Sequence, residues 1–128
     1  MSICLMVGAS LLALSDRSFT LDWQHSVEKT RWRESWQVTA DGLHLTEAAV
    51  KGSGAGMEPG EGAHLQGGWW VWAPDLDPLP NLSLATSGAT GAGWHLCSGE
   101  ICHDIPETGA TVVLRPCTEE EWRKGSGP

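Results

Sequence analysis

The sequence predicts an all-β protein, either a small antiparallel sandwich or a flattened barrel of about nine short strands. Three observations lead to this prediction. Apolar and polar residues alternate with a period of two in several short runs, such as "FTLDWQH". Turn residues separate these runs at short intervals. No stretch longer than about twelve residues carries a convincing helical period. We therefore expect residues 1–128 to form one β domain.

The chain opens with an apolar stretch, "ICLMVGASLLAL", that has two interpretations. It is apolar enough for the central part of a signal peptide, but no Lys or Arg precedes it, and it is too short to cross a bilayer. We favour two short strands joined at Gly8, Ala9 and Ser10. The chain then shows no clear signal peptide and no membrane span.

The next runs predict one strand followed by a hairpin. "FTLDWQH" places Phe19, Leu21 and Trp23 on one face, and His25 ends that face. "SWQVTA" and "LHLTEAAV" alternate in the same way on either side of Asp41-Gly42. This dipeptide is a strong turn signal, so the two runs should pair.

A glycine-rich loop, "KGSGAGMEPGEG", separates the hairpin from the second half of the chain. The apolar run "WWVWAP" follows and is predicted to be a strand. It places Trp70 and Trp72 on one face and Trp69 on the other, either as packing residues or as an aromatic wall for a sugar or a cation. A proline-rich connection, "APDLDPLPN", then leads to the short strand "LSLATS".

The last elements are a hairpin, a strand and one helical turn. "GWHLC" and "ICHDI" flank residues 98–100 and should form the hairpin. "TVVLRP" is the last predicted strand. "TEEEW" is predicted to be a single helical turn, with Thr118 as its N-cap and acidic residues at its start.

Composition excludes some classes of partner. The net charge is −8, from eight Lys and Arg residues against sixteen Asp and Glu residues. Sequence-independent nucleic-acid binding needs a basic surface, so we expect no nucleic-acid partner. The chain has eight Trp, one Phe and no Tyr. Because Trp combines a large apolar area with one N–H donor, several tryptophans should lie at the core boundary or in a groove wall.

The stretch "HSVEK", at 25–29, is the first candidate site. In an extended chain Ser26 and His25 point to opposite sides, which disfavours a nucleophile–base pair. Two interpretations stay open: a polar strand end with weak surface ion pairs, or a site for a polar ligand or partner. The candidate binding residues are His25, Ser26, Glu28, Lys29 and Glu34, with Glu47 as an alternative to Glu34.

The glycine loop is the second candidate site. Backbone N–H groups freed by Gly52, Gly54 and Gly56 can form a nest for an anion, and Lys51 beside them favours an anionic ligand. The loop is neither a Walker motif nor a dinucleotide fingerprint, since "GSGAGMEP" ends in no "GK[ST]" and precedes no helix. A plain turn-forming loop is the alternative.

The cysteines form the third candidate. A two-residue turn at Gly99-Glu100 places Cys97 opposite Cys102, close enough for a disulfide. Two free thiols remain an alternative, as does a zinc site formed with His95 and with His103 or Cys117, although the spacing is not that of paired CxxC motifs. Cys4 and Cys117 can pair as well if the first and last strands are neighbours.

The order of these pieces resembles a bacterial family catalogued as domain of unknown function 1850. The pieces are "FTLDWQHSVEKTRWRESWQV", "GLHLTEAAVKGSGAGMEP", "GWWVW" and "LRPC". The likeness covers nearly the whole chain, and "HSVEK" and "GSGAGMEP" are its most specific parts. Members of that family are typically encoded beside TRAP transporters of the TAXI type, which import small organic acids. Relatives often carry a leader or membrane anchor, which implies a place outside the cytoplasm or at the membrane.

The resemblance therefore implies an accessory protein of a TAXI-type TRAP uptake system. Because the candidate residues include no nucleophile–base–orienter set, we expect this protein not to be an enzyme. We expect it to act as a binding or interaction module without cofactor or metal. Its expected partners are the membrane or substrate-binding subunits of the transporter, or a small organic acid. The alternatives are an organic-anion binder that uses the glycine loop, and a hydrolase that uses His25 with Glu28 or Glu34. In all three, "HSVEK" and the glycine loop should meet at one rim of the fold.

Overall fold

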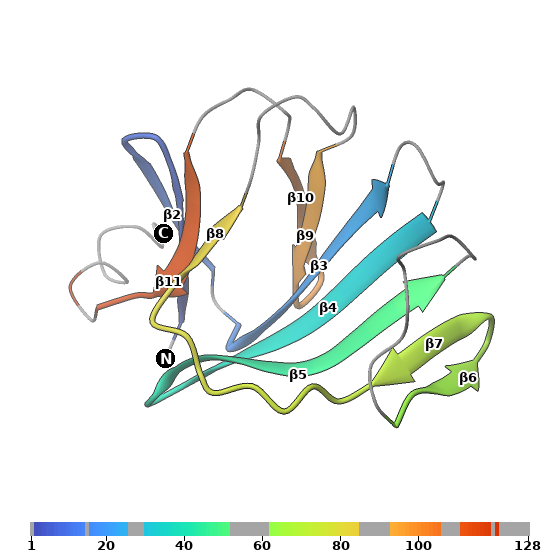
Figure 1. Cartoon of the computed structure of the whole chain (residues 1–128). Helices are drawn as coiled ribbons and strands as arrows, with labels where there is room; N and C mark the ends of the chain where they lie inside the picture. The colour runs from blue at the N-terminus through green and yellow to red at the C-terminus, as the bar shows by residue number, and fades with distance from the viewer. Residues whose placement is uncertain are drawn as a thin grey trace.

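The computed structural model describes residues 2–14, 16–25, 30–51, 62–84, 93–105, 111–118 and 120, and only the backbone at 24, 25 and 30. Within these residues, eleven strands form two antiparallel sheets (Figure 1). The all-β prediction is confirmed, and two separate sheets are its sandwich form. No helix in the described part of the chain is long and apolar enough to cross a membrane.

The small sheet has the strand order β2-β1-β11-β8, so the first and last strands of the chain lie side by side. Its strands are β1 (Ile3–Val7), β2 (Ser10–Leu14), β8 (Leu82–Leu84) and β11 (Val112–Pro116). The N-terminal apolar stretch is therefore two strands, as predicted. Their turn contains Gly8, whose φ of 60° is the left-handed conformation that glycine adopts without strain.

The large sheet has the strand order β10-β9-β3-β4-β5-β7-β6. Its strands are β3 (Ser18–His25), β4 (Thr30–Thr39), β5 (Gly42–Lys51), β6 (His64–Gln66), β7 (Trp69–Trp72), β9 (Trp94–Ser98) and β10 (Ile101–Ile105). Both predicted hairpins are present, β4–β5 and β9–β10. The predicted helical turn falls largely outside the described residues, which include only Thr118 and Glu120 of its five positions.

Strand β6 is absent from the sequence prediction. It has three residues, too few to show an alternating pattern, and all three are exposed at the sheet edge. A signal was nevertheless present, because Gly67 and Gly68 separate it from β7 and adopt φ values of 60° and 89°. A Gly-Gly pair between short runs is a hairpin signal.

The core lies between the two sheets, and the small sheet covers only one end of the large one (Figure 1). The side chains that fill it come from both sheets and are almost fully buried: Ile3, Leu5, Leu14, Phe19, Leu21, Trp36, Val38, Leu43, Leu45, Leu84, Leu96, Ile105, Val112 and Leu114. At the other end, β3, β4 and β5 extend past the small sheet (Figure 1). This leaves part of the inner face of the large sheet outside the core.

The chain crosses from the large sheet to the small sheet along the start of β5. There, Leu43 and Leu79 exchange two backbone hydrogen bonds, of 2.7 and 2.8 Å. Gly42 has a φ of 126°, and a Cβ at this position would clash with the carbonyl oxygen of Leu79. Glycine is therefore required here both by its own conformation and by the close approach of the crossing segment.

A disulfide between Cys4 and Cys117 ties the ends of the chain together within the small sheet. The Cα atoms are 5.0 Å apart, the sequence separation is 113, and Cys4 is fully buried. The adjacent backbone bond from Cys117 N–H to the Ser2 carbonyl, 3.0 Å, continues the pairing of β1 with β11. In the chain-entropy model such a long loop makes the cross-link strongly stabilising.

Replacement of Cys4 and Cys117 together by alanine should lower the free energy of unfolding by about 4 kcal/mol, because the unfolded chain regains the entropy of a long loop. Urea denaturation followed by tryptophan fluorescence measures this loss. The matched control is Cys97→Ala with Cys102→Ala, whose sequence separation is 5. Its loss should be smaller, about 2 kcal/mol. Equal losses in the two double variants would contradict the assignment of Cys4–Cys117 as the main covalent stabiliser.

Candidate functional site

The strands that carry the two predicted motifs end side by side. His25, the last residue of β3, pairs in register with Thr30, the first residue of β4. Arg31 then pairs with Lys51, the last residue of β5. Ser26, Glu28 and Lys29, and likewise Gly52, Gly54 and Gly56, lie outside the described residues. The strand ends that carry the two motifs are therefore adjacent, at the end of the large sheet that extends past the small one (Figure 1).

The inner face of the large sheet at this end carries four tryptophans that contact one another across four strands. Trp23 of β3 stacks on Trp32 of β4, with ring centroids 5.9 Å apart and planes 8° apart. Trp94 of β9 contacts the other side of Trp23 at 4.5 Å. Trp72 of β7 meets Trp32 edge to face at 6.0 Å. We call Trp94, Trp23, Trp32 and Trp72 the tryptophan row.

The row lies at the boundary of the core. Trp23, Trp32 and Trp72 do not belong to the core cluster, whereas Trp94 packs against it. All four side chains are half-buried, and the neighbouring Trp70, also on the inner face, is 39% exposed. Offset and edge-to-face contacts hold aromatic rings more firmly than area burial alone does. The row is therefore a rigid and partly exposed apolar surface.

Glu34 lies on the same inner face, beside the row. It pairs in register with Leu21 of β3 and with Ala48 of β5, both buried apolar residues. Its Oε1 accepts a hydrogen bond of 3.2 Å from the indole Nε1–H of Trp36. Burial raises the pKa of the Glu34 carboxyl, and the bond from Trp36 opposes this shift. A carboxyl with a raised pKa in an apolar setting is a recognised mark of a functional position.

Lys51 does not join Glu34. A β-bulge between Ser35 and Trp36 adds one residue to β5 at Thr46, and the alternation of β5 changes phase there. Without the bulge, Lys51 would lie on the face of Leu43, the inner face. With it, Lys51 lies on the outer face, its Nζ 5.8 Å from the ring centroid of Trp69. Glu34, a candidate of the first site, and Lys51, a candidate of the second, therefore lie on opposite faces of the sheet.

The outer face at the same end is polar and cationic. The guanidinium of Arg33 lies 4.2 Å from the centroid of the Trp69 ring, a cation–π contact. Arg31 and Asp22 form an exposed pair, with 3.8 Å between nitrogen and oxygen, which contributes about 0–1 kcal/mol. Trp69 thus lies apart from Trp70 and Trp72, as the alternation predicts. Glu47, the alternative to Glu34, is exposed and pairs in register with Ser35.

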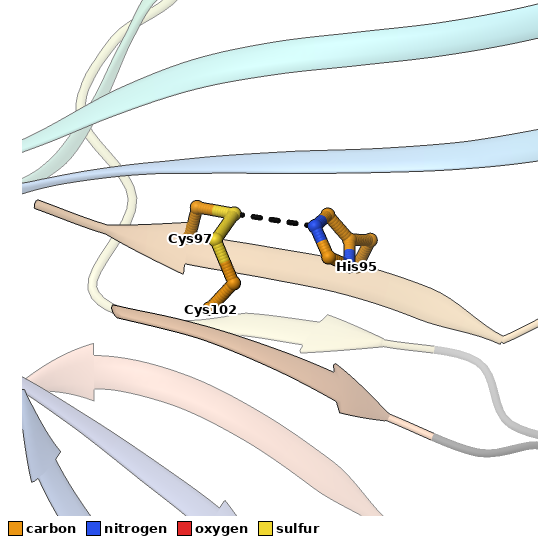
Figure 2. A group of neighbouring side chains, drawn as sticks. All are labelled: His95, Cys97 and Cys102. Carbon is orange, nitrogen blue, oxygen red and sulfur yellow. Dashed lines mark hydrogen bonds between the residues drawn. A yellow bond between two sulfur atoms is a disulfide. The ribbon is translucent and has the colours of Figure 1, made fainter. Parts of the chain in front are cut away.

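The third candidate lies on the outer face of the β9–β10 hairpin. Cys97 and Cys102 pair in register and form a disulfide, with Cα atoms 4.0 Å apart (Figure 2). Gly99 begins the turn with a φ of 63°. The nitrogen and sulfur atoms of His95, Cys97 and Cys102 all lie within 4.8 Å of one another. A disulfide offers no thiolate, so the zinc alternative would first require reduction of the pair.

Neither of the two residues predicted as the fourth zinc ligand lies beside His95, Cys97 and Cys102. His103 neighbours Cys102 in β10, so its side chain points to the other face of the sheet. Cys117 is bonded to Cys4 in the small sheet.

Sequence reasoning missed the partners of two of these side chains. Trp23 faces Trp32 across β3 and β4, and the hairpin turn at Gly99 places His95 opposite Asp104. The second pair follows from the predicted register of Cys97 with Cys102. The first pair was missed because the second predicted strand begins at Ser35, whereas β4 begins at Thr30. Also not predicted from the sequence was a depression of about 430 Å³ on the outer face beside the bulge, lined by both polar and apolar residues. Its hydroxyl-bearing lining residues are Ser18, Thr20, Ser35 and Thr46.

The Glu34→Gln variant should gain stability relative to the parent protein as the pH rises. Because the pKa of Glu34 is raised in the folded state, the folded protein holds its proton longer than the unfolded chain does. The stability of the parent therefore falls as the pH rises from the usual glutamate pKa, about 4.3, through the raised one. The amide introduced by Glu34→Gln keeps an acceptor for the Trp36 indole but does not ionise.

The measurement is a series of urea denaturation curves at increasing pH, starting near the usual glutamate pKa of about 4.3. The stability difference between Glu34→Gln and the parent should grow in favour of the variant. Glu47→Gln, at an exposed position on the other face, controls for the loss of one negative charge. A Glu34→Gln difference that shrinks with rising pH would contradict the burial of this carboxyl.

A match to a known protein family covers the part of the chain that forms the large sheet. A family model described as "Domain of unknown function (DUF1850)" matches residues 19–105, more than half of the chain. The matched span includes every strand of the large sheet, from β3 to β10. No curated protein and no solved structure matches the chain. The chain belongs to the family of domain of unknown function DUF1850.

Proposed function

We propose that this protein is a non-enzymatic accessory module of a TAXI-type TRAP uptake system for organic acids. In this proposal it binds a subunit of the transporter through the tryptophan row. The association with the transporter rests on the family resemblance. The binding surface rests on one observation: four tryptophans from four strands form a partly exposed apolar surface where the sandwich is not closed.

The composition of this end of the sheet suits a protein partner. Tryptophan and arginine are among the residues most enriched at the positions that dominate binding energy in protein interfaces. Besides the row, Trp70 is 39% and Leu65 of the neighbouring edge strand 61% exposed. Arg31 and Arg33 lie on the outer face of the same strand ends. A partner that covers this end would therefore bury aromatic side chains in the middle of the contact and meet cations at its border.

Binding fits the described residues better than hydrolysis does. Glu34 accepts a hydrogen bond from the indole of Trp36 and lies between apolar neighbours. Cys97 and His95 are in contact, but the sulfur is already bonded to Cys102 and cannot attack an ester. Two disulfides also suit an oxidising compartment outside the cytoplasm, where a transporter subunit would be met.

A second candidate function is the binding of a small organic anion at the glycine loop. Arg33 and Lys51 favour it, because both cations lie on one face at the point where this loop begins. Titration calorimetry of the purified protein with dicarboxylates separates the two functions. If the parent protein gives heat with dicarboxylates and the Lys51→Gln variant does not, the result favours the anion-binding function. Under the interaction proposal, the protein alone gives no heat with these compounds.

Replacement of Trp32 by alanine should weaken binding to the transporter subunit at least ~10-fold, because Trp32 contacts both Trp23 and Trp72 in the row. Biolayer interferometry with the purified substrate-binding and membrane subunits measures the affinity. Trp69→Ala is the matched control, since Trp69 lies on the opposite face, and its affinity should stay within about threefold of the parent. His25→Ala with Glu28→Ala examines the charged motif in the same assay.

Circular dichroism first establishes that each variant is folded. If the folded Trp32→Ala variant binds the subunit as tightly as the Trp69→Ala variant does, the tryptophan row is not part of the interface. No binding of either subunit by the parent protein would remove the proposed function itself.

A further inference from the structure

The Cys97–Cys102 disulfide lies where a reagent can reach it. β10 is the edge strand of the large sheet, and Cys102, on that strand, is exposed. Cys97, on β9, is half-buried and lines the depression on its other side. Cys4 of the other disulfide has no exposed surface. The two bonds therefore differ in access, and the hairpin bond is the one more open to a thiol from solution.

A histidine is directed at one of the two sulfurs. The Nε2 atom of His95 lies 3.3 Å from Sγ of Cys97 (Figure 2). The Nδ1 atom of the same ring lies 2.5 Å from Oδ1 of Asp104, directly opposite on β10. Because a carboxylate only accepts hydrogen bonds, Nδ1 is the nitrogen that donates to Asp104, and Nε2 is the nitrogen that faces the sulfur. Asp104, His95 and Cys97 thus form a line of three groups.

The hairpin does not need this bond for its register. A two-residue turn with Gly99 at positive φ already sets the pairing of Ser98 with Ile101. The bond closes a loop with a sequence separation of only 5, which makes it a weak constraint on the unfolded chain. The side chains of His95 and Asp104 are 44% and 87% exposed, so their contact is also a weak source of stability. Stabilisation of the hairpin therefore does not explain why the Cys97–Cys102 disulfide lies beside His95 and Asp104.

We propose that Cys97–Cys102 is a redox-active disulfide that exchanges with the thiol of a partner, with His95 assisting the departure of Cys97. The partner is defined by its chemistry: a thiolate, on a small molecule or on a protein. This activity is separate from the proposed binding of a transporter subunit and does not rest on it.

The exchange runs in two steps, each of which forms and breaks one S–S bond. The incoming thiolate attacks the exposed Sγ of Cys102, and the Cys97–Cys102 bond breaks. The electron pair of the broken bond stays on Cys97, and the imidazolium of His95 donates its Nε2 proton toward this thiolate. A second thiolate then attacks the partner's sulfur in the mixed disulfide, releases oxidised partner and leaves Cys102 reduced. Two partner thiols are oxidised and one protein disulfide is reduced.

The charged groups around His95 come from three strands. Asp104 of β10 faces it on one side, and Asp22 of β3 pairs with it in register on the other. Arg31 of β4 contacts Asp22 at 3.8 Å. The groups next to the ring are thus carboxylates, which attract a positively charged imidazolium, and an imidazolium stabilises a neighbouring thiolate.

The first experiment times the reduction of the native protein by dithiothreitol and by a reduced cysteine-containing peptide, with alkylation and mass spectrometry to locate each thiol. Cys97–Cys102 should open at least ~100-fold faster than Cys4–Cys117. His95→Gln should slow the opening of the hairpin bond about tenfold and leave Cys4–Cys117 unchanged. His103→Gln is the matched control, since this histidine lies on the same hairpin but on the other face. Opening by dithiothreitol alone supports small thiols as the partner class, and opening by both reagents supports proteins as well.

Because an exposed disulfide is reduced quickly even without a neighbouring histidine, the second experiment measures the effect of His95 on the Cys97 thiol separately. In Cys102→Ser, Cys97 is a free thiol beside His95. Its alkylation by iodoacetamide should reach half of its maximal rate at a lower pH than in Cys102→Ser with His95→Gln. Equal pH profiles in these two proteins, or equal opening rates for His95→Gln and His103→Gln, would overturn the proposal. So would a hairpin bond that opens no faster than Cys4–Cys117.

Discussion

A difference in strand length between the two sheets determines where the candidate site lies. β4 and β5 have ten residues each, whereas β1, β2 and β11 have five. At about 3.3 Å per residue, the long strands extend about 33 Å and the short ones about 17 Å. The small sheet leaves part of the inner face uncovered (Figure 1). That part must be occupied by side chains that tolerate both contact and water, and tryptophan is such a residue.

The indole donors explain why a carboxyl is kept on the inner face. Trp36 is only 4% exposed, so its Nε1–H would be left without a partner unless an acceptor lay within reach. Glu34, two residues earlier on the same face of β4, provides this acceptor. The cost is a buried carboxyl with a raised pKa. This hydrogen bond joins Trp36 of the core to Glu34, which lies two positions from Trp32 of the tryptophan row on the same face of β4.

Much of this arrangement could be predicted from the alternation of residues, and the exceptions have physical causes. The period-two pattern correctly assigned the faces of Phe19, Leu21 and Trp23, because β3 is regular along its length. The same alternation does not extend from Leu43 to Lys51, because the bulge at Thr46 inverts the phase of β5. Two consecutive exposed polar residues, Thr46 and Glu47, were the available sign of this bulge. The division into two sheets was beyond local patterns, since it depends on contacts between distant strands.

The two disulfides show how similar bonds acquire different roles from their surroundings. Cys4–Cys117 joins residues at opposite ends of the chain, with Cys4 fully buried and Cys117 half-buried, and its main effect is to restrict the unfolded chain. Cys97–Cys102 joins neighbours across a turn that is already stable, at an exposed edge and beside an imidazole. Opening the second bond leaves the first in place, and with it the pairing of the first and last strands. Because Cys4–Cys117 still joins the first and last strands, the Cys97–Cys102 disulfide of the edge hairpin can be reduced and formed again without unfolding of the protein.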